Sequence, residues 1–445
     1  MTALSKFFRQ TLGLELLTAN CHEYCHVWNP NCHGAVLDAC KDGFPFCLKT
    51  YTTFYLISSL IRKKDPRKID YKRLVNDVLR SSVFLTMNMF WYVFLICRMR
   101  QLLGFGTWPT VSFVNGFLSS FLAIIIEKKQ RRPMLALYLT NLASETAYTQ
   151  LVSRGYLKFI SNGQSILFAA GLFGFLYLYK QNKLDKELSS ILNLTHQLEG
   201  KDEILPLKRM PRFLQMFYQA IRKHESGKHD LCQHKYSCLS NVAESTSKNF
   251  AIGLTISVCL ASIRSIRQPT SLLKNLLSWS NLKMPAFFAS MPLLYHSSKC
   301  IMHRTLNKDS ALITATSGFI SGASMLFYPS TSIALYIFWK CVEIYYFKLV
   351  EKGVIPSIKH GDILLYTLST GYVLGNAFIE PQNLRKGYYQ FLCGLTGDRV
   401  NLLNRRLFDK FGFHSNVLFE NYIPKLDHKV VTINPALYLP IQPPK

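Results

Sequence analysis

The fold follows from a stretch of thirty residues without a single charge, Ser310–Trp339, which reads SALITATSGFISGASMLFYPSTSIALYIFW. A helix crosses a bilayer with about 20 apolar residues, so this stretch is too long for one ordinary span and short for two. Pro329 lacks the N–H donor that a continuing helix needs. We therefore predict two helices here, with a turn at Tyr328–Thr331.

Long uncharged runs recur along the chain of 445 residues. Apolar residues make up 49% of the sequence and charged residues 18%, and the charges gather in short clusters between the runs. The other runs are Ser81–Cys97, Gln101–Ile126, Phe159–Tyr179, Asn249–Ile263 and Ile363–Ile379. So many uncharged stretches exceed what a soluble core uses, and they predict a multi-pass integral membrane protein.

The chain is strongly basic, with 52 Lys and Arg against 26 Asp and Glu. The basic clusters lie just outside the apolar runs, at Arg62–Lys68, Lys128–Arg132 and Lys180–Lys186. This placement is typical of loops that positive charge holds on one side of a membrane. A nucleic-acid binder would carry a reader motif beside its basic patch, and none is present. We therefore expect membrane lipids as partners and no nucleic acid.

The sequence contains an internal repeat at a spacing of 198 residues. Residues 136–167 match residues 334–365 at 11 of 32 positions, where unrelated sequences would share about 2. Glu145 matches Glu343, and Gly155 matches Gly353. In the first copy the charged turn 127–132 cannot stay in lipid, which supports the turn predicted at Tyr328–Thr331 in the second.

Each copy is expected to hold five helical segments, so the predicted fold is an all-α integral membrane protein of two tandem repeats with 8–10 transmembrane helices. The segments are residues 44–61, 81–98, 109–126, 133–153 and 159–180, then 248–264, 284–301, 310–327, 331–350 and 361–379. If all five cross, the copies lie inverted; if the first is interfacial, they lie parallel. The predicted domains are a Cys/His-rich segment (1–43), the first repeat (44–181), a polar basic linker (182–247), the second repeat (248–380) and a tail (381–445).

The sequence contains two clusters of Cys and His. One cluster precedes the first helical segment of the first copy, and the other precedes the first helical segment of the second copy. The first gives the candidate metal ligands Cys21, Cys25, His26 and Cys32, and the second contains His224, His229, Cys232, His234 and Cys238. Thiolate and imidazole are the usual zinc ligands, and four of them close a tetrahedral site. The spacing lacks the paired Cys-x-x-Cys pattern, so the alternatives are a structural zinc ion and reduced cysteines on a loop.

Two acids and two glycines stand out inside the apolar segments. A carboxylate at membrane depth is a functional candidate, which singles out Glu145 and Glu343; the alternative is an ion pair, such as Glu343 with Lys340. Gly318 and Gly322 form a GxxxG pattern that lets two helices approach closely. We find no P-loop, nucleotide-binding glycine fingerprint, nucleophile elbow or His-Glu-x-x-His helix, so we do not expect an enzyme.

Several motifs resemble the transmembrane protein 135 family, also called peroxisomal membrane protein 52. The N-terminal pattern Cys21-x-Glu23-x-x-His26-x-Trp28-x-Pro30-x-Cys32 looks like the first motif of that family. Further similar motifs are Glu127-Lys-Lys-x-Arg-Arg132, Asn141-Leu-Ala-x-Glu-Thr146, Gly318-Phe-x-x-Gly-x-Ser-Met-x-Phe-Tyr328, Leu384-Arg385 with Tyr388, Phe391 and Leu392, and Ile423-Pro-x-Leu-Asp427. Each repeat is also distantly similar to the superfamily of mitochondrial inner-membrane translocases and small peroxisomal membrane proteins.

The resemblance implies a multi-pass protein of the peroxisomal and mitochondrial membranes. It implies a non-enzymatic role in mitochondrial dynamics, the balance of fission and fusion, in peroxisome organisation and in lipid metabolism. The fission machinery and peroxisomal import factors are the protein partners that such a role suggests. The alternative function is a repeat-built transporter or channel for a lipid-derived or small solute, because transporter sites form between repeats.

Overall fold

The computed structural model describes residues 3–63, 65–198, 212–223, 228–265, 278–427 and 429–434. Within these residues the regular structure is helical, apart from one isolated bridge between Leu17 and Gly106. The predicted all-α class is therefore confirmed for the described part of the chain. The chain divides into two compact units, which we call unit 1 (Met1–Phe159 with Ser357–Lys445) and unit 2 (Ile160–Pro356).

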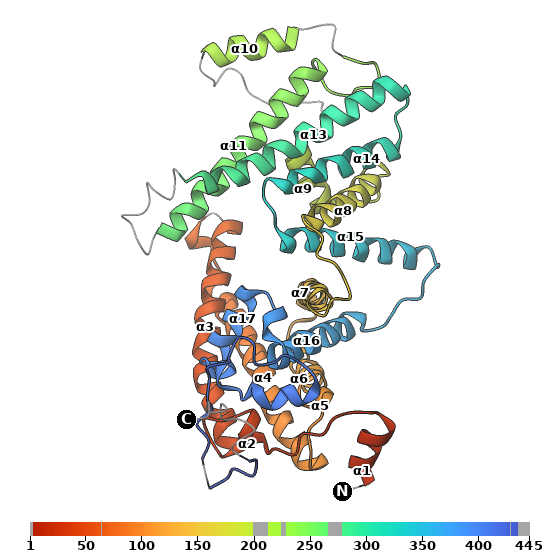
Figure 1. The fold of residues 1–445 in the computed structure, drawn as a ribbon. Coiled ribbons are helices and arrows are strands. Elements are labelled where there is room, and N and C mark those ends of the chain that lie inside the picture. Colours follow the sequence, from red (N-terminus) through yellow and green to blue (C-terminus); the bar gives the residue numbers. More distant parts are fainter. Residues whose placement is uncertain are drawn as a thin grey trace, which may run out of the picture. The chain divides into compact units, whose positions relative to one another are not determined.

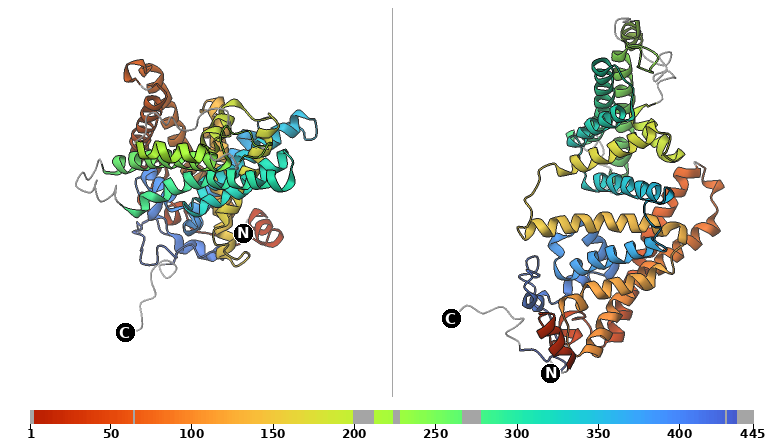
Figure 2. Two further views of the ribbon diagram at one scale, coloured as in Figure 1. Left: turned by 90° about the horizontal axis from the view of Figure 1, so that it is seen from above. Right: turned by 90° about the vertical axis from the view of Figure 1, so that its right-hand side faces the viewer.

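Unit 1 is built around long helices from both ends of the chain. Its elements are α1 (Ala3–Lys6), η1 (Phe7–Thr11), α2 (Cys21–Tyr24), α3 (Cys32–Lys63), η2 (Pro66–Lys68), α4 (Tyr71–Leu103), α5 (Trp108–Val111), α6 (Phe113–Ile124), η3 (Lys129–Arg131), α7 (Arg132–Ser153), α16 (Gly361–Ile379), η9 (Pro381–Asn383), α17 (Lys386–Thr396), η10 (Arg399–Leu402) and η11 (Arg405–Phe411). Helix α3 packs along α4, and α16 packs against both α6 and α7 (Figures 1 and 2).

Unit 2 has its own set of packed helices. Its elements are α8 (Gly163–Lys180), α9 (Lys186–His196), α10 (Arg212–Lys223), α11 (Cys238–Ser265), η7 (Trp279–Leu282), α13 (Lys283–Leu306), α14 (Ala311–Ser321), η8 (Gly322–Leu326) and α15 (Thr331–Glu351). Helix α11 packs along α13, and α8 packs against both α14 and α15 (Figure 1). The predicted turn at Tyr328–Thr331 is confirmed, because η8 ends before it and Ser330 caps α15 by accepting from the N–H of Ile333.

Each of the ten predicted segments coincides with a helix or a helix pair, but the units differ from the predicted copies. The last segment of the first copy, α8, lies in unit 2, and the last segment of the second copy, α16, lies in unit 1. The loops that lead to these helices share a backbone conformation. Gly155 and Gly353 have φ values of 77° and 72°, and Asn162 and His360 have values of 56° and 60°. The predicted linker and tail also contain helices, since α9 and α10 fall in residues 182–247 and α17 follows residue 380.

One helix of the described residues, α4, is long and apolar enough to cross a membrane. The apolar stretches Trp108–Ile124 and Ala311–Leu326 are shorter than a full span. The polar side chains inside the other helices lower their mean hydropathy, as Glu145 does in α7. The expected number of eight to ten spans therefore stays a prediction.

Candidate metal centres

The structure gathers four donors from the N-terminal region into one group, which we call centre 1. Cys21 begins the short helix α2, His26 follows that helix, Cys32 begins α3, and Cys97 lies on α4. The donor atoms of these four side chains all lie within 4.8 Å of one another. Their elements meet because the two long helices α3 and α4 pack together, so that the start of one lies near the end of the other.

The imidazole of His26 presents its Nε2 atom to centre 1. Its Nδ1 atom donates to the backbone oxygen of Asn29 at 2.7 Å. The Nε2 atom is buried and has no hydrogen-bond partner among the described residues. A backbone carbonyl that holds Nδ1–H leaves Nε2 as the free lone pair, which is the usual arrangement of a metal-binding histidine.

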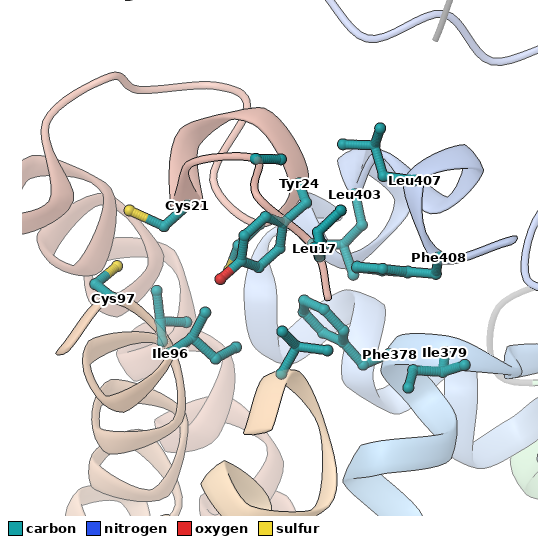
Figure 3. Packing of buried hydrophobic residues seen from close by; sticks show 14 of the residues in the cluster. Leu17, Cys21, Tyr24, Ile96, Cys97, Phe378, Ile379, Leu403, Leu407 and Phe408 are labelled. Atoms are coloured by element: carbon teal, nitrogen blue, oxygen red, sulfur yellow. The ribbon is translucent and has the colours of Figure 1, made fainter. Parts of the chain in front are cut away.

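Cys21 and Cys97 of centre 1 belong to a hydrophobic cluster of sixteen buried residues that come from both the N-terminal and the C-terminal part of unit 1. Figure 3 shows Cys21 and Cys97 beside each other near Ile96, with Tyr24 packed towards Phe408. The fully buried Glu23 carboxylate accepts hydrogen bonds from the N–H groups of Thr432 and Ile433. These hydrogen bonds hold residues 432 and 433 against helix α2, which begins at the ligand Cys21 and precedes the ligand His26.

A second group of four donors, which we call centre 2, lies in unit 2. Cys232 and His234 belong to the loop before α11, Cys238 begins α11, and Cys300 lies on α13. Their donor atoms also lie within 4.8 Å of one another. His234 repeats the arrangement of His26, because its Nδ1 atom donates to the backbone oxygen of Tyr236 at 2.6 Å.

The two centres occupy matching places in their helix pairs. Cys32 and Cys238 are the first residues of α3 and α11. Cys97 and Cys300 each lie six residues before the last residue of their helix, α4 or α13. Both centres thus join the start of one long helix to the end of its neighbour.

Three of the four predicted ligands, Cys21, His26 and Cys32, are brought together, whereas Cys25 lies outside the group. The Cys25 side chain lines an apolar cavity, and burial raises the pKa of its thiol. The fourth donor is Cys97 instead. In the second cluster, His229 is not among the four donors and His224 lies outside the described residues.

Sequence reasoning missed Cys97 and Cys300 because each lies more than 60 residues after its partners. A single cysteine in an apolar segment usually serves as a small buried hydrophobic residue, so neither position stands out in the sequence. A signal was present, since the two cysteines are 203 residues apart, close to the spacing of the repeat. Aligning cysteines across the copies would have paired them.

The singled-out acids are both engaged in ion pairs. Glu145 on α7 pairs with Arg385, whose Nε donates to its Oε2 at 2.9 Å. Glu343 on α15 pairs with Lys340 at 2.5 Å, one turn away on the same helix. The pairing alternative for Glu343 is therefore what the structure shows.

The glycine pattern on α14 and η8 faces helix α8. A Cβ atom at Gly318 would lie 2.3 Å from Cδ1 of Leu176, and one at Gly322 would lie 2.4 Å from the Cα of Ala169. Glycine is therefore required at both positions for the two helices to approach.

Unit 1 also encloses an apolar cavity of about 450 Å³. Its wall includes Tyr51, Phe84, Tyr92, Tyr366, Arg385 and Arg399. The Trp28 Nε1 and Tyr92 Oη atoms are buried in this region and have no hydrogen-bond partner among the described residues. A cavity with an apolar body and a few polar groups is the usual form of a small-molecule site.

Each centre offers three thiols and one imidazole, a complete set for a tetrahedral zinc ion. Catalytic zinc sites keep a position for water, and a set of four protein ligands leaves none. All twelve cysteines of the chain are free thiols in the structure. The arrangement can therefore hold a structural ion and offers no position for a reaction on it.

Comparison with known proteins identifies the N-terminal part of the chain. No solved structure matches the chain. Residues 18–152, which contain all four donors of centre 1, match the N-terminal cysteine-rich region of Transmembrane protein 135. This match supports the transmembrane protein 135 family for the N-terminal part of the chain, which makes up 135 of its 445 residues.

Proposed function

We propose that the protein is a non-enzymatic, multi-pass membrane protein that regulates mitochondrial fission and fusion and peroxisome organisation, with a structural zinc ion in centre 1. The observation that carries this proposal is the closed donor set of centre 1, which suits a rigid scaffold and not a reaction site. The ion pairs of Glu145 and Glu343 support the same conclusion, because neither acid is left to bind a solute.

The proposed location is the peroxisomal and mitochondrial membranes, and both this location and the proposed link to lipid metabolism rest on the resemblance to the transmembrane protein 135 family. Basic loops supply the surface for protein partners. The residues Arg62, Lys63, Arg67 and Lys68 are all exposed around the end of α3 and η2. Fission machinery and peroxisomal import factors are the partners that we propose for this surface.

A rescue experiment tests the proposed function. Cells that lack the protein should show altered mitochondrial length and peroxisome number, and the native chain should restore both. Replacing the four exposed basic residues by Glu should leave the protein in its membranes but abolish the rescue. Replacing the exposed Lys352 and Lys359 by Glu provides a matched control that should rescue fully. Normal organelles in cells without the protein would contradict the proposal.

A second candidate function, binding or transport of a lipid-derived solute, is favoured by the cavity of unit 1. The unpartnered Trp28 Nε1–H and Tyr92 hydroxyl would suit an ester or other polar head, and the apolar wall would suit a chain. A photoactivatable fatty acid should then label the native protein in vesicles, and Leu139→Trp, which fills the cavity, should suppress the labelling. Flux of the fatty acid through the same vesicles would distinguish transport from binding.

A further inference from the structure

The donor atoms of centre 2 are spaced as the corners of one coordination shell. Cys232 Sγ lies 3.9 Å from both Cys238 Sγ and Cys300 Sγ, and His234 Nε2 lies 3.8 Å from Cys300 Sγ. Ligand sulfurs about 2.3 Å from a tetrahedral zinc ion are about 3.8 Å apart. A disulfide would bring two sulfurs to about 2.05 Å and would leave the other two donors unused. The spacing fits a single ion between four donors.

Polar side chains of α13 and the loop after it supply a second layer around the sulfurs. His303 Nδ1 lies 3.7 Å from Cys232 Sγ, and its Nε2 atom lies 3.5 Å from Asp309. Arg304 Nη2 lies 3.9 Å from Cys238 Sγ. Three thiolates around Zn²⁺ carry a net negative charge, which an N–H donor and a guanidinium stabilise.

The resemblance between the two centres makes a chance grouping of reduced cysteines a poor explanation. Both use three Cys and one His, both fix the His through Nδ1 and a backbone carbonyl, and both take their last ligand from the end of the second long helix. Thiolate-rich tetrahedral sets select zinc among the common divalent ions. We propose that centre 2 is a second structural zinc site, so that the chain holds two zinc ions, one in each unit.

The ion at centre 2 ties the loop before α11 to the end of α13. Apolar burial does little to hold this loop, because the buried hydrophobic cluster at this place consists of Cys232, Cys238 and Cys300 alone among the described residues. Metal binding therefore supplies order that apolar burial does not provide there. This inference goes beyond the proposed function, and it can hold or fail whether or not the protein regulates organelles.

Zinc content of the full-length protein tests the proposal. The native chain, purified in detergent without chelator, should contain about two zinc ions per chain by elemental analysis. The double variant Cys232→Ser/Cys238→Ser should contain about one, and Cys21→Ser/Cys32→Ser should also contain about one. Cys259→Ser changes an exposed cysteine of α11 outside the group and should keep both ions.

A conservative exchange keeps the test decisive if the serine variants misfold. His234→Cys preserves four ligands and should retain two ions, whereas His234→Ala should lose one. Native protein with one ion, serine variants at centre 2 that keep the native zinc content, or stoichiometric iron in place of zinc would each overturn the proposal. Loss of one ion only in Cys21→Ser/Cys32→Ser would leave centre 1 as a metal site and refute centre 2.

Discussion

Centre 1 and centre 2 present the same donors in different surroundings. Two donors of centre 1, Cys21 and Cys97, share a cluster with fourteen other buried hydrophobic residues, and Glu23 accepts hydrogen bonds from the backbone N–H groups of Thr432 and Ile433. In the described part of unit 2, the three cysteines of centre 2 are the whole of their buried hydrophobic cluster. Apolar burial thus stabilises the loop of centre 1, whereas the loop of centre 2 depends on its ligands and on a few contacts to α10, such as the hydrogen bond from Ser237 Oγ to the Ile221 carbonyl at 2.9 Å.

The same ligand set can therefore have two structural roles. In unit 1 an ion would add to the stability that a hydrophobic core already provides. In unit 2 the ion would stabilise a loop that has no such core beside it. The stability of each loop without metal should therefore differ, although the donors do not.

Metal removal should have the largest effect and should separate the two centres. Structural zinc sites contribute on the order of 10 kcal/mol of binding free energy. Without the ion, we expect residues 228–240 to lose protection from hydrogen exchange, while residues 18–32 stay largely protected. Exchange measured before and after treatment with a strong chelator checks this. Equal loss of protection at both loops would show that the hydrophobic cluster of unit 1 does not compensate.

Removal of Glu23 should weaken unit 1 while zinc is present. The carboxylate also accepts from the backbone N–H of Asn20 at 2.6 Å and from the hydroxyl of Thr432 at 3.0 Å. Because each hydrogen bond to a charged group is worth about 1.5 to 3 kcal/mol, Glu23→Ala should cost at least about 3 kcal/mol and free residues 429–434. Limited proteolysis and thermal unfolding measure both effects. The exposed Glu420→Ala is the control, and an unchanged melting temperature for Glu23→Ala would refute this anchoring role.

Gly322→Val should destabilise unit 2 by up to about 3 kcal/mol. A Cβ there would lie 2.4 Å from the Cα of Ala169, so η8 and α8 would have to separate. Gly116→Ala in unit 1 should cost less, because its Cβ would lie 2.9 Å from Cα of Gly371. Thermal unfolding compares the two variants. Gly387→Ala meets nothing within 4 Å and should be nearly neutral. A larger loss at Gly116 than at Gly322 would reverse this order.

Acidification should weaken unit 2 through His196. Burial lowers the pKa of this imidazole to about 4, from an ordinary value of 6.5. The unfolded chain therefore binds the proton more readily, and stability is lost as the pH falls from 6.5 towards 4. Between pH 7 and pH 5 the loss should be about 2 kcal/mol. Thermal unfolding at both values should show a smaller difference for His196→Gln. An unchanged pH dependence in that variant would contradict the assignment.

The smallest effects should come from the two singled-out acids. Both pairs are partly exposed, with Glu145 at 21% and Glu343 at 22% side-chain exposure, so each Glu→Gln change should cost about 1 kcal/mol or less. The double variant should fold, reach its organelles and restore their form in the rescue experiment. Normal assembly with loss of rescue, or of a measured solute flux, would make these acids the functional site.

Local sequence patterns are sufficient to predict the helical segments and the turn before α15. Apolar runs, the charged turn at 127–132 and Pro329 are local signals, so they predict local structure. The sequence also located three donors of centre 1, because Cys21, His26 and Cys32 are near one another in the chain.

The side chains that complete each centre, and the helices that form each unit, depend on the packing of segments that are distant in sequence. Cys97 and Cys300 join their groups only because α4 and α13 pack against α3 and α11, and Cys25 is excluded because it turns towards the cavity. Similarly, α8 and α16 each belong to the unit built mainly from the other copy. Periodicity and composition describe each segment alone, whereas the pairing of distant segments depends on the shapes of their faces, such as the glycine surface that admits α8 against α14.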